Sequence, residues 1–187
     1  MEKELDAEFK KAEDELIKNL NDYLVTESDI KVRHALIIRD IIGDDYVVST
    51  EWGISGTEKN TTRAKFDLAV IKKWPSEQEL GPECFKKYKP VYAAEYKLDG
   101  QKTFPKTAQV DGFIKQVKRL HDAKIEKTFA LYHYRGRGNN WDISKEKSKV
   151  DNLKLSAGLN LRVTFVHNNK AFCDLYPFSG WKEFNLL

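Results

Sequence analysis

The sequence predicts one α/β domain that spans residues 1–187. Segments with apolar residues at helical spacing alternate along the chain with segments rich in β-branched and aromatic residues, which are typical of strands. With 41% apolar residues, the chain can bury a core of its own. Because neither an internal repeat nor a linker divides it, we expect a single domain.

Four segments have the pattern of helices. The first carries an apolar stripe and has acidic residues on its other side. Thr26 or Ser28 can cap the second, which ends before Gly43, and Pro105 is well placed as the first residue of the third. The fourth is rich in lysine and is compatible with a helix. In order, the expected helices cover residues 1–25, 27–42, 105–123 and 145–157.

Five segments have the pattern of strands. The first two are expected to form a hairpin whose long connection, 53–62, is rich in Gly, Ser, Thr and Asn. Residues 73–90 hold three of the five prolines and are interpreted as an excursion before the third strand. The expected strands cover residues 46–52, 63–71, 91–98, 128–134 and 161–166.

The third strand contains two charged residues in an otherwise apolar run. Glu95 and Lys97 share one face of this strand, roughly 7 Å apart, because side chains alternate between faces. Charges in a buried strand are costly, which suggests that they converge on something outside themselves. Asp67 is the one charged residue in the apolar part of the second strand, so its carboxylate can meet that of Glu95 if the two strands are neighbours. The alternative is an exposed salt bridge on an edge strand.

Paired carboxylates predict a particular chemistry. Together with a backbone carbonyl they supply the hard oxygen ligands that Mg²⁺ or Mn²⁺ prefers, and water and a substrate phosphate fill the other positions. Beside such an ion, Lys97 would orient or deprotonate the attacking water, or stabilise the charge that develops on phosphorus. The pattern therefore predicts metal-dependent hydrolysis of a phosphodiester bond.

The order of these motifs resembles the PD-(D/E)XK nuclease superfamily, which has the restriction-endonuclease-like fold. The resemblance rests on Phe66–Asp67 followed, after the excursion, by Glu95–Lys97. It covers residues 27–135 and leaves 136–187 as an extension of the same domain. It implies a mixed central β-sheet flanked by helices, and a metal-dependent nuclease, expected to be an endonuclease, that acts on DNA, with RNA left open.

The resemblance also assigns roles to the residues of the motif. Asp67 and Glu95 would bind Mg²⁺ or Mn²⁺ together with the backbone carbonyl of Tyr96, and Lys97 would be the catalytic lysine. The sequence departs from the motif at Phe66, where the superfamily's name has a proline.

Two further positions of the superfamily have several candidates here. Many members carry an acid on the preceding helix, for which Glu27 is the first choice and Asp29 and Glu51 follow; Glu27 equally suits a helix N-terminus without a further role. Many members also carry a glutamine on the helix after the third strand. Gln109 and Gln116 lie on the same side of that helix, and Gln116 fits the spacing better.

The charge distribution is compatible with a polyanionic partner. Residues 1–30 hold ten acidic and four basic residues, so their net charge of −6 leaves +9 for residues 31–187. Such an excess attracts phosphates, although it also serves solubility. The basic residues expected to contact DNA are Lys86, Lys87, Arg119, Arg135 and Arg137.

Other features narrow the expected class of protein. No apolar run approaches the ~20 residues of a membrane span, and the charged start lacks a secretory pattern, so we expect an intracellular, cytoplasmic protein. Cys84, Cys173 and the scattered histidines lack the spacing of a zinc site. One active site cuts one strand, so a homodimer is expected, with the acidic N-terminal helix or the C-terminal strand region as its contact. The alternative function is an inactive nuclease fold that binds nucleic acid or a partner.

Overall fold

The computed structural model describes residues 2–20, 26–54, 64–73, 90–100, 107–123, 125–135, 143–155, 161–167, 170–175 and 180–186. Within these ranges the helices are α1 (Glu2–Lys18), α3 (Glu27–Ile42), α5 (Thr107–Asp122) and α6 (Ser144–Leu155). The strands are β1 (Tyr46–Ile54), β2 (Ala64–Lys72), β3 (Tyr92–Asp99), β4 (Lys127–Tyr134), β5 (Leu161–His167), β6 (Lys170–Leu175) and β7 (Gly180–Asn185). None of the described helices is long and apolar enough to cross a membrane.

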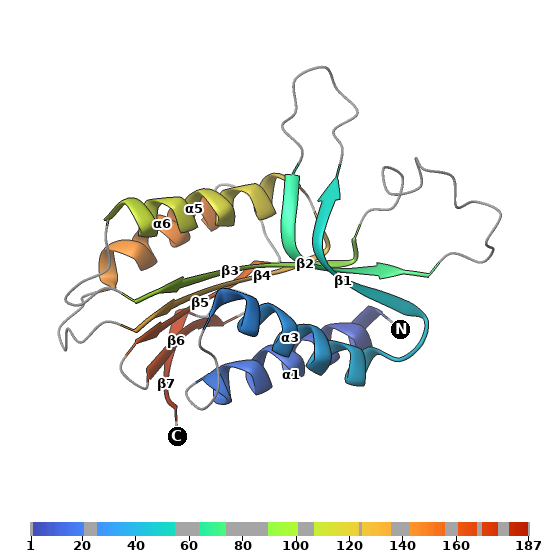
Figure 1. Ribbon diagram of the computed structural model, residues 1–187. Helices are drawn as coiled ribbons and strands as arrows, with labels where there is room; N and C mark the ends of the chain where they lie inside the picture. The colour runs from blue at the N-terminus through green and yellow to red at the C-terminus, as the bar shows by residue number, and fades with distance from the viewer. Residues whose placement is uncertain are drawn as a thin grey trace, which may run out of the picture.

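The strands form one mixed sheet that is covered by helices on both faces. Its order follows the chain from β1 to β7; β3, β4 and β5 are parallel to one another, and the other neighbours are antiparallel. Figure 1 shows α1 and α3 on one face of the sheet and α5 and α6 on the other. The predicted α/β class and the mixed central sheet are therefore confirmed.

The helices pack on the sheet through two apolar cores. On one face, Leu16 of α1 and Ile38 of α3 belong to a buried cluster that includes Phe129 of β4. On the other, Phe113 of α5 lies against Tyr132 and Phe165 of the central strands. The apolar stripe of the N-terminal helix is thus buried within its own chain.

Local sequence explains where α3 begins. Of the two expected caps, Thr26 is the one used: its hydroxyl accepts a hydrogen bond from the Asp29 backbone, and the Asp29 carboxylate accepts one from the Thr26 backbone. Gly43 follows the last residue of α3 with φ 71°, a conformation that favours glycine. This capping box makes Glu27 the first residue of the helix.

Two differences from the predicted elements concern the sheet. β6 and β7 were not predicted, because both are short and mix charged with apolar residues; pairing with β5 and with each other stabilises them beyond their intrinsic preference. The edge-strand alternative for the third strand is wrong, because β3 lies between β2 and β4. Several predicted features lie outside the described residues. They are most of the connections at 53–62 and 73–90, together with Cys84 and the helix start at Pro105.

Candidate active site

Three carboxylates lie side by side across neighbouring strands: Glu51 on β1, Asp67 on β2 and Glu95 on β3. β1 and β2 are paired on both sides of Glu51 and Asp67. The ladder between β2 and β3 ends one position short of Asp67 and Glu95. The expectation that the second and third strands are neighbours is confirmed, and this carboxylate row is where their regular pairing stops.

The Asp67 carboxylate is held from two directions. The backbone N–H of Tyr96 donates to Asp67 Oδ2 at 2.9 Å, in place of a ladder bond between the strands. The ammonium of Lys31, on α3, lies 2.8 Å from Asp67 Oδ1. These two contacts fix the orientation of the carboxylate on a half-buried side chain.

Glu95 is a buried acid with perturbed ionisation. Its side chain is 1% exposed, and burial together with the charge of Asp67 raises its pKa from 4.5 to about 8. The guanidinium of Arg119, on α5, forms an ion pair with Glu95 Oε1 and opposes this rise. A hydrogen bond joins the two carboxyl groups of Asp67 and Glu95. Glu95 therefore keeps its proton to a higher pH than an ordinary glutamate does.

Lys97 is also beside the row, two residues beyond Glu95 on the same strand. Its Nζ lies 3.5 Å from Glu27 Oε2, and both side chains are about one-third exposed. The structure thus brings Glu27 to the lysine and not into contact with Asp67 or Glu95. Asp29, the second candidate acid, is used in the cap of α3.

The two candidate glutamines of α5 differ in their surroundings. With its amide nitrogen turned towards Asp99, Gln109 donates to both carboxylate oxygens, at 2.8 and 2.5 Å. The side-chain oxygen of Gln116 is buried and has no hydrogen-bond partner in the described structure. Gln116 precedes Arg119 by one helical turn, so it lies on the side of α5 from which Arg119 reaches Glu95.

Lys31 and Lys65 were not predicted as residues of this site. Lys31 Nζ contacts Glu51 Oε1 at 2.6 Å as well as Asp67, and Lys65 Nζ lies 2.5 Å from Glu51 Oε2. Burial acts to lower the pKa of Lys31, but the hydrogen bonds to Asp67 and Glu51 outweigh it and raise the pKa above its usual range. A sequence signal for Lys31 exists: it follows Glu27 by four residues and so shares its helix face.

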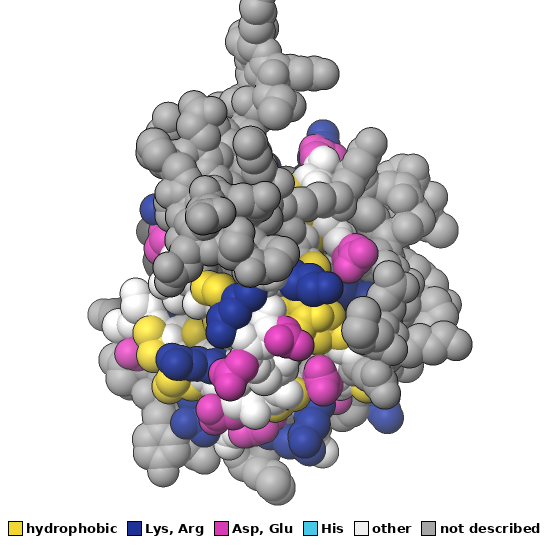
Figure 2. All heavy atoms as spheres, turned by 90° about the vertical axis from the view of Figure 1, so that its right-hand side faces the viewer, with side chains coloured by type: hydrophobic (Ala, Val, Ile, Leu, Met, Phe, Trp, Pro, Cys, Tyr) yellow, Lys and Arg dark blue, Asp and Glu magenta, His cyan; other side chains and the backbone are white. Residues whose placement is uncertain are grey.

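The predicted nucleic-acid contacts are only partly covered by the described residues. Lys86, Lys87 and Arg137 lie outside them. Arg135 is exposed directly after β4, and its backbone N–H donates to the Asp99 carbonyl at 2.7 Å. Figure 2 shows basic and acidic side chains interspersed on one face of the molecule, with no continuous basic surface among the residues described there.

The donor set suits a hard divalent cation chemically, although its protein ligands are few. In the described ranges no three Asp, Glu, His or Cys side chains converge on one metal position. The Asp67–Glu95 pair offers oxygen ligands alone, and an ion bound there would take its remaining ligands from a carbonyl, water or phosphate. Burial and the neighbouring carboxylate raise the pKa of Glu95, and a cation bound between the two acids would relieve the repulsion that contributes to this rise.

His34, His133, His167 and the described cysteine are parts of the packed interior. His34 Nδ1 is 2.6 Å from the Tyr96 hydroxyl, and burial lowers the pKa of His34 to about 3. His133 and His167 are buried on β4 and β5, and Cys173 is a buried free thiol. These four side chains are therefore packed among the buried residues of the sheet and α3.

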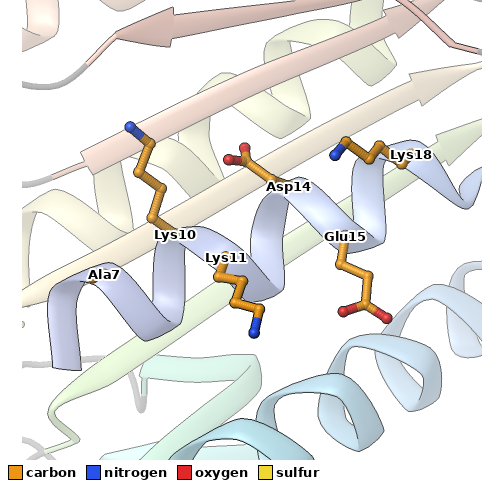
Figure 3. Close-up of a pocket in the computed structure, with 6 residues that line it drawn as sticks. All are labelled: Ala7, Lys10, Lys11, Asp14, Glu15 and Lys18. Carbon is orange, nitrogen blue, oxygen red and sulfur yellow. The ribbon is translucent and has the colours of Figure 1, made fainter. Parts of the chain in front are cut away.

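An open hollow of about 430 Å³ lies along α1, apart from the carboxylate row. It is lined by Ala7, Lys10, Lys11, Asp14, Glu15 and Lys18. Figure 3 shows Lys10 and Lys11 pointing to opposite sides of the helix, so their ammonium groups do not converge on one ligand.

Comparison of the chain with protein-family models, curated proteins and solved structures finds no match.

Proposed function

We propose that this protein is a metal-dependent nuclease of the restriction-endonuclease-like fold that hydrolyses phosphodiester bonds within DNA. The observation that carries the proposal is the contact between Asp67 and Glu95 on neighbouring strands, with Lys97 beside them on β3. Two carboxylates and a lysine in this arrangement are the groups that a hydrolysis of this kind requires.

Each residue then has a role in the reaction. Asp67, Glu95 and the Tyr96 carbonyl would hold Mg²⁺ or Mn²⁺, and the ion would supply polarisation of the phosphate and a lowered pKa of a water. Lys97 orients that water or stabilises the charge on phosphorus. Glu27 contacts Lys97 alone among the described residues of the site, so we assign it to positioning the lysine and not to binding the metal.

Side chains of α5 complete the site on its other side. Gln116 presents a buried oxygen without a partner, which a water in the site would satisfy. Arg119 is 40% exposed and has the planar guanidinium that binds phosphate well, so it would exchange Glu95 for the DNA backbone once a metal ion neutralises that carboxylate. A double-strand cut would require two such sites, which a homodimer supplies.

Purified protein incubated with supercoiled, linear, single-stranded and branched DNA, and with RNA, tests this function. Cleavage is expected with Mg²⁺ or Mn²⁺ and is expected to stop with EDTA or with Asp67→Ala. Glu183→Ala is a matched control, because Glu183 is also an acidic strand residue in an ion pair with a lysine, Lys170, but lies at the far edge of the sheet. Activity that survives EDTA or Asp67→Ala refutes the metal mechanism. DNA binding without cleavage of any substrate favours the inactive binding protein.

A further inference from the structure

We propose that Lys31 is a permanent cation of the carboxylate row that occupies the place of a second metal ion. The protein would then bind one divalent ion at each active site. This inference rests on the proposed function and concerns a residue to which neither the sequence motif nor the resemblance gave a role.

The row of Glu51, Asp67 and Glu95 has two gaps, and they are filled differently. In the first, Lys31 Nζ lies 2.6 Å from Glu51 Oε1 and 2.8 Å from Asp67 Oδ1, so one ammonium bridges two carboxylates. In the second, Asp67 and Glu95 contact each other, and no cation of the described residues contacts both. Only the second gap lacks a bridging positive charge.

The protein holds Lys31 firmly in the first gap. Its side chain is 14% exposed and extends from the second turn of α3, a helix with a full capping box. The neighbouring Ile30 and His34 are buried against the sheet, which fixes the face of the helix that carries Lys31. The ammonium is therefore delivered from a rigid element and not from a mobile surface side chain.

The backbone of Glu51 is a second, independent sign that this gap is built. Glu51 has φ 61°, the only left-handed non-glycine residue among those described, and this conformation is costly for a residue with a Cβ atom. It occurs inside a strand, at the position whose carboxylate meets Lys31 and Lys65. The unusual backbone conformation and the two ion pairs thus coincide at one residue of the first gap.

The chemistry of two-metal phosphodiesterases explains what the ammonium replaces. Their ions lie roughly 3.5–4 Å apart and clamp the attacking and leaving oxygens. Asp67 is the member of the row that borders both gaps, so it would be the shared ligand. Lys31 supplies one positive charge and hydrogen-bond donors there, but it cannot coordinate water or phosphate oxygens as a metal does. Lys31 acts through Asp67 and is thus a positioning residue.

Metal stoichiometry separates this role from that of an ordinary salt bridge. The full chain, without nucleic acid, is titrated with Mn²⁺ by equilibrium dialysis and electron paramagnetic resonance. The wild type is expected to bind one ion. Lys31→Met is expected to bind two, with the spectral broadening of neighbouring ions, and Lys31→Arg is expected to return to one. Adding Glu51→Gln to Lys31→Met is expected to abolish the second ion.

Lys65→Met is the matched control, because Lys65 also pairs with Glu51 but does not contact Asp67 and is 62% exposed. It is expected to keep a stoichiometry of one. Circular dichroism accompanies each variant, and Lys31→Gln replaces Lys31→Met if the latter fails to fold. A second ion in the wild type, or a single ion in the folded variant without the Lys31 charge, overturns the inference and leaves the nuclease proposal standing. No Mn²⁺ binding by the wild type overturns the proposed function itself.

Discussion

Glu95 makes the stability of the metal-free protein depend on pH in a direction unusual for an acid. Burial and the charge of Asp67 raise its pKa from 4.5 to about 8 in the folded protein. In the unfolded chain the group keeps its ordinary pKa, so between these values the folded state binds one proton more. The contribution of Glu95 to stability is therefore present in full below the unfolded pKa and is lost as the pH rises through the folded one.

The size of this effect follows from the difference between the folded and the unfolded pKa of Glu95. Each pH unit between the two pKa values corresponds to about 1.4 kcal/mol, so the whole difference amounts to about 5 kcal/mol of unfolding free energy. Glu95→Gln removes the titration while keeping the shape of the side chain. The variant should gain stability relative to the wild type by up to about 5 kcal/mol between about pH 4.5 and pH 8.

Urea unfolding in EDTA at a series of pH values measures this difference. His34, His133 and Glu13 also have shifted pKa values, but both proteins contain them, so their contributions cancel in the comparison. A difference between the two proteins that stays constant with pH would refute the buried proton. Mg²⁺ at the alkaline end should stabilise the wild type and not the variant, because the ion takes the place of the proton.

Three further predictions, with four variants, test separate parts of the structure. Lys97→Ala should abolish turnover while leaving metal and DNA binding largely intact, whereas Glu95→Ala should also weaken metal binding; equal loss of metal affinity in both contradicts these roles. Thr26→Ala should lower the unfolding free energy by about 1 kcal/mol through loss of the α3 cap, measured by chemical denaturation; an unchanged value contradicts it. Arg162→Met should cost about 3–5 kcal/mol, because it leaves the buried Glu13 carboxylate unpaired, and the melting temperature should fall most at alkaline pH.

Patterns within single segments predicted the four helices and the first five strands. Contacts between segments were predicted only where the alternation of side chains along a strand determined them. The positions of Asp67 and Glu95 followed from strand alternation once their strands were taken as neighbours. Lys31 was missed because its role depends on how α3 crosses β1 and β2, which no local pattern contains. Helical spacing placed Gln109 and Gln116 on one side of α5. Only the position of Asp99, to which Gln109 donates, shows that the two side chains have different surroundings.

The acidic side chains around the row are balanced in charge by nearby basic side chains of the described residues. The site contains as many cationic as acidic side chains, namely Lys31, Lys65, Lys97 and Arg119 with Glu27, Glu51, Asp67 and Glu95. Lys31 lies on α3, Lys65 on β2 and Lys97 on β3, whereas Arg119 lies on α5. On the proposed function, a divalent ion between Asp67 and Glu95 would compete with the proton of Glu95 and would weaken the Arg119 ion pair. Arg119 would then be available to a phosphate, so we expect metal binding and substrate binding to strengthen each other by the same factor.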